Sequence, residues 1–212
     1  TDNTTFESAY NFNTPVTSSF TIYAKWIAAG GEVYAADLFI SEYIEGSGTI
    51  RAIEIFNGTG VTIDLSNYRI ANYTNGSATV TSNYILSGTL THGDVAVIYY
   101  TSGASASLIS AANTASITLT TNSNAVNFNG DDAIALQKNI SSVWTNIDVI
   151  GKIGVDPGSA WSANGVSTVN MTLVRKQNII SGDSDGTNDF DPSLEWTGYV
   201  TDTFTYLGSH TA

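Results

Sequence analysis

A short alternating run gives the first indication of the fold class of this chain: Ile50-Arg51-Ala52-Ile53-Glu54-Ile55-Phe56-Asn57-Gly58. Successive side chains of a β-strand point to opposite faces, so Ile53 and Ile55 would share one face and Glu54 and Phe56 the other. The closing Asn-Gly pair favours a turn, because both residue types tolerate a positive φ. We therefore expect a strand over residues 50–57 that ends at a turn.

Other segments repeat this pattern on both sides of the run. Candidate strands lie at 38–44, 68–73, 80–86, 95–101, 117–121, 133–138, 143–150 and 171–176. Turn pairs separate several of them: Asn75-Gly76, His92-Gly93 and Asn129-Gly130. Residues 104–112 predict a short helix or a crossover between two sheets. Short strands with turns rather than long helices between them indicate an all-β protein, an antiparallel β-sandwich, which loosens after Gly151 into a loop-rich extension.

The composition agrees with a β protein whose surface is polar but weakly charged. Thr, Ser and Asn supply 71 of the 212 residues, whereas charged residues make up only 12%. Surface helices depend on Lys, Glu and Arg, so an all-helical protein is excluded. With 7 basic and 19 acidic residues the net charge is −12, which disfavours binding to nucleic acid or to an anionic membrane.

Cysteine is absent, so disulfides, thiolate zinc sites and cysteine nucleophiles are excluded together. No apolar run approaches the ~20 residues that span a bilayer. The start Thr1-Asp2-Asn3-Thr4 lacks the basic and apolar parts of a signal peptide, so we expect a piece of a longer protein. Acidic, Thr- and Asn-rich chains without disulfides are common among bacterial surface proteins, which favours an extracellular or cell-surface location.

The N-terminal segment reads as a separate unit. Residues 20–26 alternate apolar and polar side chains, and Ala28-Ala29-Gly30-Gly31 is typical of a flexible linker. The run Asn11-Phe12-Asn13-Thr14-Pro15-Val16-Thr17, with the ending Tyr23-Ala24-Lys25-Trp26, resembles the closing half of the Listeria–Bacteroides (internalin B-type) repeat. That resemblance implies that residues 1–27 are the truncated end of a β-grasp module and that 28–35 form a linker.

A second resemblance covers roughly residues 36–209 in several blocks. The blocks are Ser41-Glu42-Tyr43-Ile44-Glu45-Gly46-Ser47, Ala52–Asn57, Val61–Tyr68, Asn129–Leu136, Ile147–Gly151, Asp156-Pro157-Gly158, Thr172–Lys176 and Phe190–Ser193 with Trp196. They resemble the lamin-tail domain, and the later blocks resemble the extension often attached to bacterial members of that family. The resemblance implies an immunoglobulin-like β-sandwich over 36–150 with a C-terminal extension, 151–212, packed on it. It also implies a non-catalytic module; because no heptads occur here, a filament role is not supported.

The best candidate metal site is an acidic loop that carries Asp183, Asp185, Asp189 and Asp191. Carboxylate oxygens in a Gly-containing turn are ligands that calcium prefers. If Gly186 stood at the sixth position of an EF-hand loop, Ser181 and Pro192 would occupy the first and the twelfth, so the loop is not an EF-hand. Calcium held in another geometry and a solvated acidic turn without metal both stay open.

Two other acidic pairs have structural explanations beside functional ones. Asp131-Asp132 could bind a cation, but a hairpin at Asn129-Gly130 would send the two side chains to opposite faces. Glu42 and Glu54 could act as a glycosidase pair across a cleft. They could instead accept hydrogen bonds from loop amides or pair with Arg51 or Arg69 at a sheet face.

Histidines and aromatic residues complete the candidates. His92 and His210 each stand alone among turn residues, so we expect exposed loop histidines. A sugar-stacking platform could be built from Trp144, Trp161, Trp196, Tyr99 and Tyr100, although large aromatics in a sandwich are often core residues. Trp161 lies in a Gly-, Ser- and Asn-rich stretch and is the candidate ligand-binding residue.

These observations favour a non-catalytic binding, tethering or spacer module of an exported bacterial surface protein. Its partner would be a protein or glycan ligand at the cell exterior, and not nucleic acid. Two alternatives remain open: a calcium-dependent carbohydrate-binding module, and an accessory domain of an extracellular nuclease.

Overall fold

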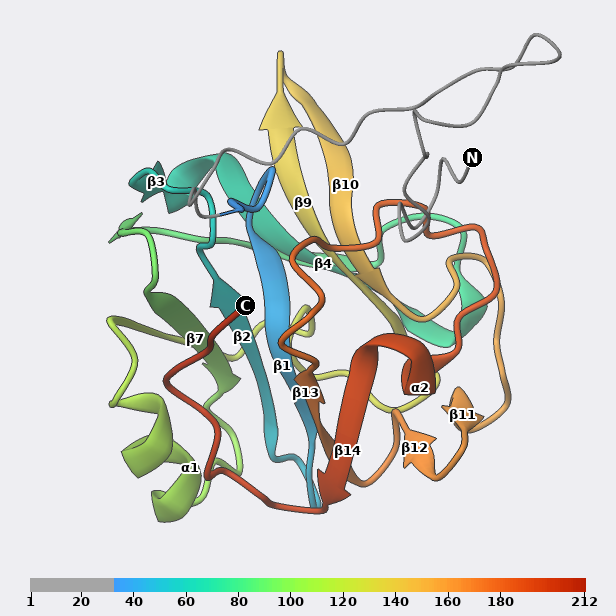
Figure 1. Cartoon of the computed structure of the whole chain (residues 1–212). Helices are drawn as coiled ribbons and strands as arrows, with labels where there is room; N and C mark the ends of the chain where they lie inside the picture. Colours follow the sequence, from blue (N-terminus) through green and yellow to red (C-terminus); the bar gives the residue numbers. More distant parts are fainter. Residues whose placement is uncertain (1–32) are drawn as a thin grey trace, which may run out of the picture. The chain divides into compact units, whose positions relative to one another are not determined.

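The computed structural model describes residues 33–212, and Tyr34–Ala212 form one compact unit (Figure 1). The predicted repeat fragment 1–27 and most of the predicted linker 28–35 lie outside the described residues.

Short strands dominate the described part of the chain. They are β1 Phe39–Glu45, β2 Arg51–Phe56, β3 Ile63–Asp64, β4 Tyr68–Tyr73, β5 Ser82–Ile85, β6 Thr89–Leu90, β7 Val95–Tyr100, β8 Ile117–Thr121, β9 Ala133–Ile140, β10 Val143–Ile150, β11 Ser162–Ala163, β12 Val166–Ser167, β13 Met171–Arg175 and β14 Trp196–Val200. The helices are α1 Ala106–Ala112 and α2 Pro192–Glu195, with 3-10 turns at Leu65–Asn67 and Thr74–Gly76. Every strand that the sequence predicted between residues 38 and 176 is present. Within residues 33–212, no helix is long or apolar enough to cross a lipid bilayer.

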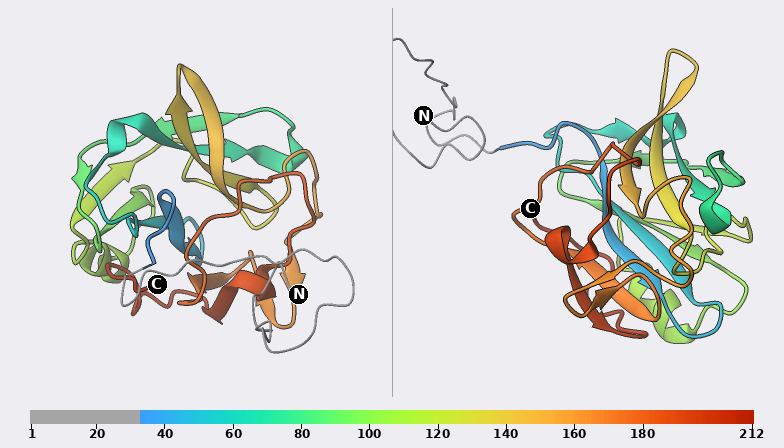
Figure 2. Two further views of the ribbon diagram at one scale, coloured as in Figure 1. Left: turned by 45° about the horizontal axis from the view of Figure 1, so that its top comes forward. Right: turned by 90° about the vertical axis from the view of Figure 1, so that its right-hand side faces the viewer.

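Two sheets form the layers of a sandwich. The larger has the strand order β14-β13-β1-β2-β7-β8, and the smaller has the order β10-β9-β4-β5. Figure 2 (left) shows the two sheets as separate layers. Two short pairs, β11–β12 and β3–β6, lie outside these sheets. The predicted immunoglobulin-like β-sandwich is therefore confirmed.

Apolar side chains from both sheets fill the space between the layers. Tyr43, Ile53 and Ile98 come from the larger sheet, and Ile70 and Leu136 come from the smaller one; all five are fully buried in one cluster. Burial of apolar surface contributes roughly 25 cal/mol per Å², so this cluster is the main source of stability.

The pairing of β7 with β8 departs from the predicted antiparallel pattern. These strands run parallel, with Ala96 opposite Ile117 and Tyr100 opposite Thr121. Parallel neighbours require a crossover connection, and α1 provides it. The helix predicted at 104–112 thus joins two strands of one sheet, and the alternative of a crossover between two sheets is wrong.

The hairpin expected at Asn129-Gly130 is also absent. Residues 122–132 instead connect β8 in the larger sheet to β9 in the smaller one. Asn129-Gly130 does open a turn, in which the backbone N–H of Asp132 donates to the carbonyl of Asn129 (3.2 Å), but this turn does not join two paired strands. A Cβ on Gly130 would lie 2.5 Å from Cβ of Val169, so glycine is also needed there for close packing. The two-residue hairpin occurs at Ser141-Ser142, where φ is 51° and 68°. Serine is not typical of positive-φ hairpin positions, so the sequence did not reveal this turn.

Residues beyond Gly151 do more than form loops. β13 pairs with β1, and β14 pairs with β13, so both belong to the larger sheet. After β14, residues 203–212 return over the outer face of that sheet, the face opposite the core; we call this segment the C-terminal strap. Leu207 of the strap packs there in a second buried cluster with Ile44, Tyr99 and Leu108.

Candidate functional site

The acidic loop 183–191 does not gather its carboxylates around one point. Asp183 accepts a hydrogen bond from the backbone N–H of Asp185 (2.9 Å). Asp185 in turn accepts from the hydroxyl (2.6 Å) and the backbone N–H (3.0 Å) of Thr187. These two hydrogen bonds hold the pKa of Asp185 below its usual range. The first two aspartates are therefore used to shape the loop.

The other two aspartates contact different elements. Asp189 forms an ion pair with Lys152 (2.7 Å), which lowers the pKa of Asp189. Asp191 caps α2 by accepting from the backbone N–H of Ser193 (2.8 Å). Across residues 33–212, no three Asp, Glu or His side chains are grouped as metal ligands. The structure does not bring the four predicted ligands together, and calcium binding stays a prediction.

Trp161 lies in a buried cluster on the outer face of the smaller sheet. Its residue is 8% exposed, and its ring meets the ring of Phe190 edge-on at 6.2 Å. It also packs with Ala135 and Val149. Its ring lies so close to Gly151 that a Cβ there would be 2.7 Å from Cζ3. Trp161 is thus a packing residue in this structure, and it does not offer an exposed face on which a sugar could stack.

The other predicted platform residues are dispersed. Trp196 is 1% exposed, and the guanidinium of Arg175 lies 4.3 Å from its ring centre. Trp144, on β10, is half-buried, and the guanidinium of Arg69 lies 4.4 Å from its ring centre. Tyr99 belongs to the second buried cluster. Trp144 is the one tryptophan among residues 33–212 that keeps substantial exposure.

A buried ion pair ties the two sheets together. Asp148 on β10 accepts from Nη2 of Arg175 on β13 (2.6 Å), and both side chains are fully buried. The same carboxylate accepts from the backbone N–H groups of Ile40 (2.7 Å) and Asp183 (3.0 Å). Arg175 also contacts Glu195 (2.6 Å). These charges are satisfied by one another and by the backbone, as a structural cluster requires.

The adjacent carboxylates Asp131 and Asp132 do not act as a pair. Asp132 is buried and accepts from the backbone N–H groups of Asn75 (2.9 Å) and Asn129 (3.2 Å), so it joins two loops. Burial raises the pKa of Asp131, with a further contribution from the neighbouring charge of Asp132. Asp132 is therefore a structural residue.

Glu42 and Glu54 face each other across β1 and β2. The pairing is irregular at Ser41, whose hydroxyl donates to Oε1 of Glu54 (2.7 Å). The backbone N–H of Gly208, in the C-terminal strap, donates to Oε2 of Glu54 (2.6 Å). Neither carboxylate oxygen of Glu42 has a hydrogen-bond partner within residues 33–212, although Glu42 is 1% exposed. The predicted hydrogen bond from a loop amide is confirmed for Glu54, but the pair lies beneath the strap rather than in an open cleft. The predicted pairing with Arg51 or Arg69 is wrong, because Arg51 pairs with Glu45 and Arg69 contacts Gln137 and Trp144.

Burial dominates the chemistry of this pair. It raises the pKa of Glu42 to about 9, with the charge of Glu54 as a second cause. It also raises the pKa of Glu54 to about 7, against the hydrogen bonds from Ser41 and Gly208. A buried charge without a partner is costly, so Glu42 is protonated at neutral pH.

His210 also differs from its prediction. Its ring lies 5.8 Å from the ring of Phe39 and 5.1 Å from that of Phe56, both edge-on. Burial lowers its pKa to about 4. The expectation of an exposed loop histidine is wrong for His210, because the strap brings it onto the sheet. It is confirmed for His92, which is exposed and accepts from the backbone N–H of Gly60 (3.1 Å).

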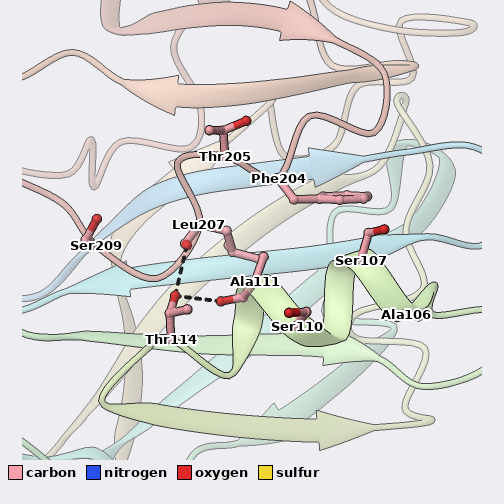
Figure 3. Close-up of a pocket in the computed structure, with 9 residues that line it drawn as sticks. All are labelled: Ala106, Ser107, Ser110, Ala111, Thr114, Phe204, Thr205, Leu207 and Ser209. Atoms are coloured by element: carbon pink, nitrogen blue, oxygen red, sulfur yellow. Dashed lines mark hydrogen bonds between the residues drawn. The ribbon is translucent and has the colours of Figure 1, made fainter.

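An open groove of about 780 Å³ separates α1 from the C-terminal strap (Figure 3). Its lining residues carry apolar or hydroxyl side chains: Ala106, Ser107, Ser110, Ala111, Thr114, Phe204, Thr205, Leu207 and Ser209. The hydroxyl of Thr114 donates to the carbonyls of Ala111 (2.7 Å) and Leu207 (3.3 Å), which joins the two walls. No ionisable side chain lines this groove.

The comparisons with known proteins give one match. A family model described as the lamin tail domain matches residues 32–154, more than half of the chain. A search of curated proteins finds no match. The resemblance of residues 11–26 to the internalin B-type repeat lies outside the matched range and stays a prediction.

Proposed function

Because this chain belongs to the lamin tail domain family, we propose that it is a non-catalytic module that binds, tethers or spaces parts of an exported bacterial surface protein. The observation that carries this proposal is the groove between α1 and the C-terminal strap. General acid–base chemistry needs an ionisable group at the substrate, and a serine nucleophile needs a neighbouring base. The groove lining offers hydroxyls without either.

The same lining fits a neutral, extended ligand. The hydroxyls of Ser107, Ser110 and Thr205 offer hydrogen bonds, and the ring of Phe204 offers an apolar surface. A peptide or glycan segment would find partners of both kinds there. The net charge of −12 and the Thr-, Ser- and Asn-rich composition support a soluble module exposed at the cell exterior.

The test combines a binding screen with a turnover assay. The purified chain is screened against a glycan array and an immobilised peptide library, and dissociation constants are measured for the strongest hits. Ser110→Arg should weaken binding at least tenfold, because an arginine side chain at this exposed position would fill the groove. Ser87→Arg, an exposed position outside the lining residues, should leave binding unchanged.

Two results would contradict the proposal. Equal affinities of the two variants would remove the groove as the binding site. Hydrolysis of nucleic acid or glycan by the rigorously purified chain would remove the non-catalytic function and would favour a role within an extracellular nuclease.

Carbohydrate binding is a second candidate, and a specific cluster on β4, β9 and β10 favours it. Trp144 stacks with Arg69, whose Nε donates to Oε1 of Gln137 (2.7 Å). The amide of Gln137 donates to Oδ1 of Asn146 (2.7 Å) and to the hydroxyl of Tyr73 (3.0 Å). An aromatic ring beside planar polar groups suits a sugar, which has both C–H and hydroxyl faces.

This candidate has its own variant. Trp144→Ala should abolish retention on immobilised oligosaccharides, whereas Val143→Ala, which removes exposed apolar surface from the adjacent position, should not. Oligosaccharide binding that survives Trp144→Ala would exclude this face.

A further inference from the structure

Glu42 and Glu54 form an unusual buried pair, because two carboxylates oppose each other without a cation. They occupy directly paired positions of β1 and β2, where Cβ atoms lie about 5 Å apart. Neither is a member of any ion pair within residues 33–212. Two neighbouring carboxylates in a buried site cannot both be ionised without a large cost. The folded arrangement therefore depends on at least one bound proton.

The C-terminal strap is what buries this pair. Leu207 packs in the second cluster, with Ile44 and Ala52. The backbone N–H of the next residue, Gly208, donates to Glu54 (2.6 Å). Two residues further on, His210 meets the rings of Phe39 and Phe56. The strap therefore passes from one apolar cluster to another directly over the acid pair.

Gly208 shows how closely the strap approaches Thr114, two residues after the end of α1. Its φ is +103°, and a Cβ there would lie 1.8 Å from Oγ1 of Thr114. Side chains hold the rest of the strap: the hydroxyl of Thr172 donates to the carbonyl of Thr203 (2.8 Å), and the rings of Tyr199 and Tyr206 lie 4.4 Å apart. These contacts fix the strap against Thr114 and against β13 and β14, and with the strap docked Glu42 and Glu54 are each 1% exposed.

We propose that Glu42 and Glu54 form a proton-binding site that couples docking of the C-terminal strap to pH. The strap is held while the pair carries protons and is released when both carboxylates ionise. This inference does not rest on the proposed function, because strap docking is measured without a ligand. If the groove does bind a ligand, release would also remove one of its walls.

The direction of the pH effect on docking depends on whether the docked or the released state binds protons more tightly. With the strap docked, the pKa values are about 7 for Glu54 and about 9 for Glu42; with the strap released, water solvates both carboxyls and their ordinary pKa of about 4.5 applies. As pH rises above 4.5 the released state loses its protons first. Docking therefore weakens progressively and reaches its minimum above pH 9.

The other titratable groups around the pair do not oppose this direction. Tyr199 on β14 has a raised pKa, caused mainly by its hydrogen bond with Tyr206 and least by the charge of Glu42, so it is neutral below pH 9. His210 on the strap has a pKa of about 4, lowered by burial and by Arg175 on β13, so it is neutral above pH 6. The lining residues contributed by α1 are uncharged. Between pH 6 and 9, the acid pair is the group whose charge changes.

Strap docking can be followed with a single spin label, because the chain has no cysteine. Ser209→Cys places a nitroxide on an exposed strap position, and Ser66→Cys places a matched label on an exposed turn outside the strap. Spectra are recorded from pH 6 to 10. We expect the mobile fraction at Ser209 to rise at least fivefold over this range while the label at Ser66 does not change. In Glu42→Gln/Glu54→Gln, a neutral isosteric pair, the rise at Ser209 should disappear.

Four results would overturn the proposal. They are no rise at Ser209 up to pH 10, an equal rise in the double variant, and a parallel rise at Ser66, which would indicate global unfolding. The fourth is mobilisation of the strap at pH 6.5 by a chelator alone, which would mean that the pair binds a metal ion instead of protons. Far-ultraviolet circular dichroism of each labelled variant verifies that it folds.

Discussion

Replacing Asp148 by alanine should destabilise the domain more than any substitution in the acidic loop. Its carboxylate accepts from Arg175 (2.6 Å), from the N–H of Ile40 (2.7 Å) and from the N–H of Asp183 (3.0 Å). The side chain of Asp148 is fully buried, so water does not reach this carboxylate. Removing one partner of a buried ion pair costs roughly 3–5 kcal/mol. Glu195 still faces Arg175 in the variant, which places the ion-pair cost near the lower bound.

The backbone N–H groups of Ile40 and Asp183, which lose their acceptor in the variant, add to that cost. A buried N–H without an acceptor costs roughly 1–3 kcal/mol, less where water can enter the vacated space. With each contribution near its lower bound the sum is about 5 kcal/mol, a large share of the roughly 5–15 kcal/mol that stabilises a domain. For a domain of this size it corresponds to a fall in Tm of about 10–20 °C.

Urea unfolding followed by tryptophan fluorescence measures the effect. The midpoint should fall at an unchanged m value, since the surface exposed on unfolding is the same. Asp189→Ala is the matched control: it also breaks an aspartate ion pair, but its side chain is 98% exposed, so the midpoint should not move. Asp148→Ala within about 1 kcal/mol of that control would refute the assignment of Asp148 as the link between the sheets.

A double variant separates the ion pair from the packing. Arg175→Met in the Asp148→Ala background removes the uncompensated charge and keeps an apolar side chain beside Trp196. The double variant should be more stable than Asp148→Ala, because replacing a whole buried ion pair is often close to neutral. A double variant that is less stable would show that the guanidinium contributes mainly through other contacts.

Three further predictions concern separate parts of the domain. Gly151→Ala should lower the free energy of unfolding by about 3 kcal/mol, because the new side chain meets both a φ of 86° and the Trp161 ring, 2.7 Å from its Cβ. Gly93→Ala, which has the same φ but open space around it, should lower it by about 1 kcal/mol. Equal losses of stability in thermal denaturation would exclude a contribution from the Trp161 contact. Folding lowers the pKa of His210 from 6.5 to about 4, so the folded state loses stability as pH falls through this range. His210→Phe should recover about 2 kcal/mol of unfolding free energy at pH 4, after allowance for the partial exposure of the histidine. If urea unfolding showed the same loss of stability at acidic pH in the variant, the prediction would be wrong. If the acidic loop 183–191 binds calcium, a hundredfold excess over its Kd should add about 2.7 kcal/mol of stability and raise Tm saturably relative to a chelator. An unchanged Tm would contradict the predicted site and leave its carboxylates to the hydrogen bonds and the ion pair that the structure shows.

The period-2 alternation of apolar residues was enough to predict the fold class and most strands. The expected strand 143–150 coincides with β10, and 68–73 with β4, because alternation is a local property that survives in any context with one buried face. The face of Glu54 was predictable in the same way. The resemblance of several sequence blocks then identified the family, which the matched range 32–154 confirms.

Turn chemistry was a poorer guide, because tertiary contacts override it. The pair Asn129-Gly130 favours a hairpin, yet it lies in a connection between two sheets, where Gly130 is needed for close packing against Val169. The actual hairpin has serines at positive φ, and the pairing of β9 with β10 supplies the energy for that conformation.

Which side chains are buried, and which groups they contact, depends on segments that lie far apart in the sequence. Nothing local shows that residues 203–212 cross β1 and β2, so the burial of Glu42 and His210 could not be inferred from the residues around them. The same holds for Asp148, whose partner Arg175 lies 27 residues away on the other sheet. The linear order of residues determines which side chains share a face of a strand. Which side chains are desolvated, and by what, depends on contacts between distant segments, and desolvation sets the pKa values and the cost of each charge.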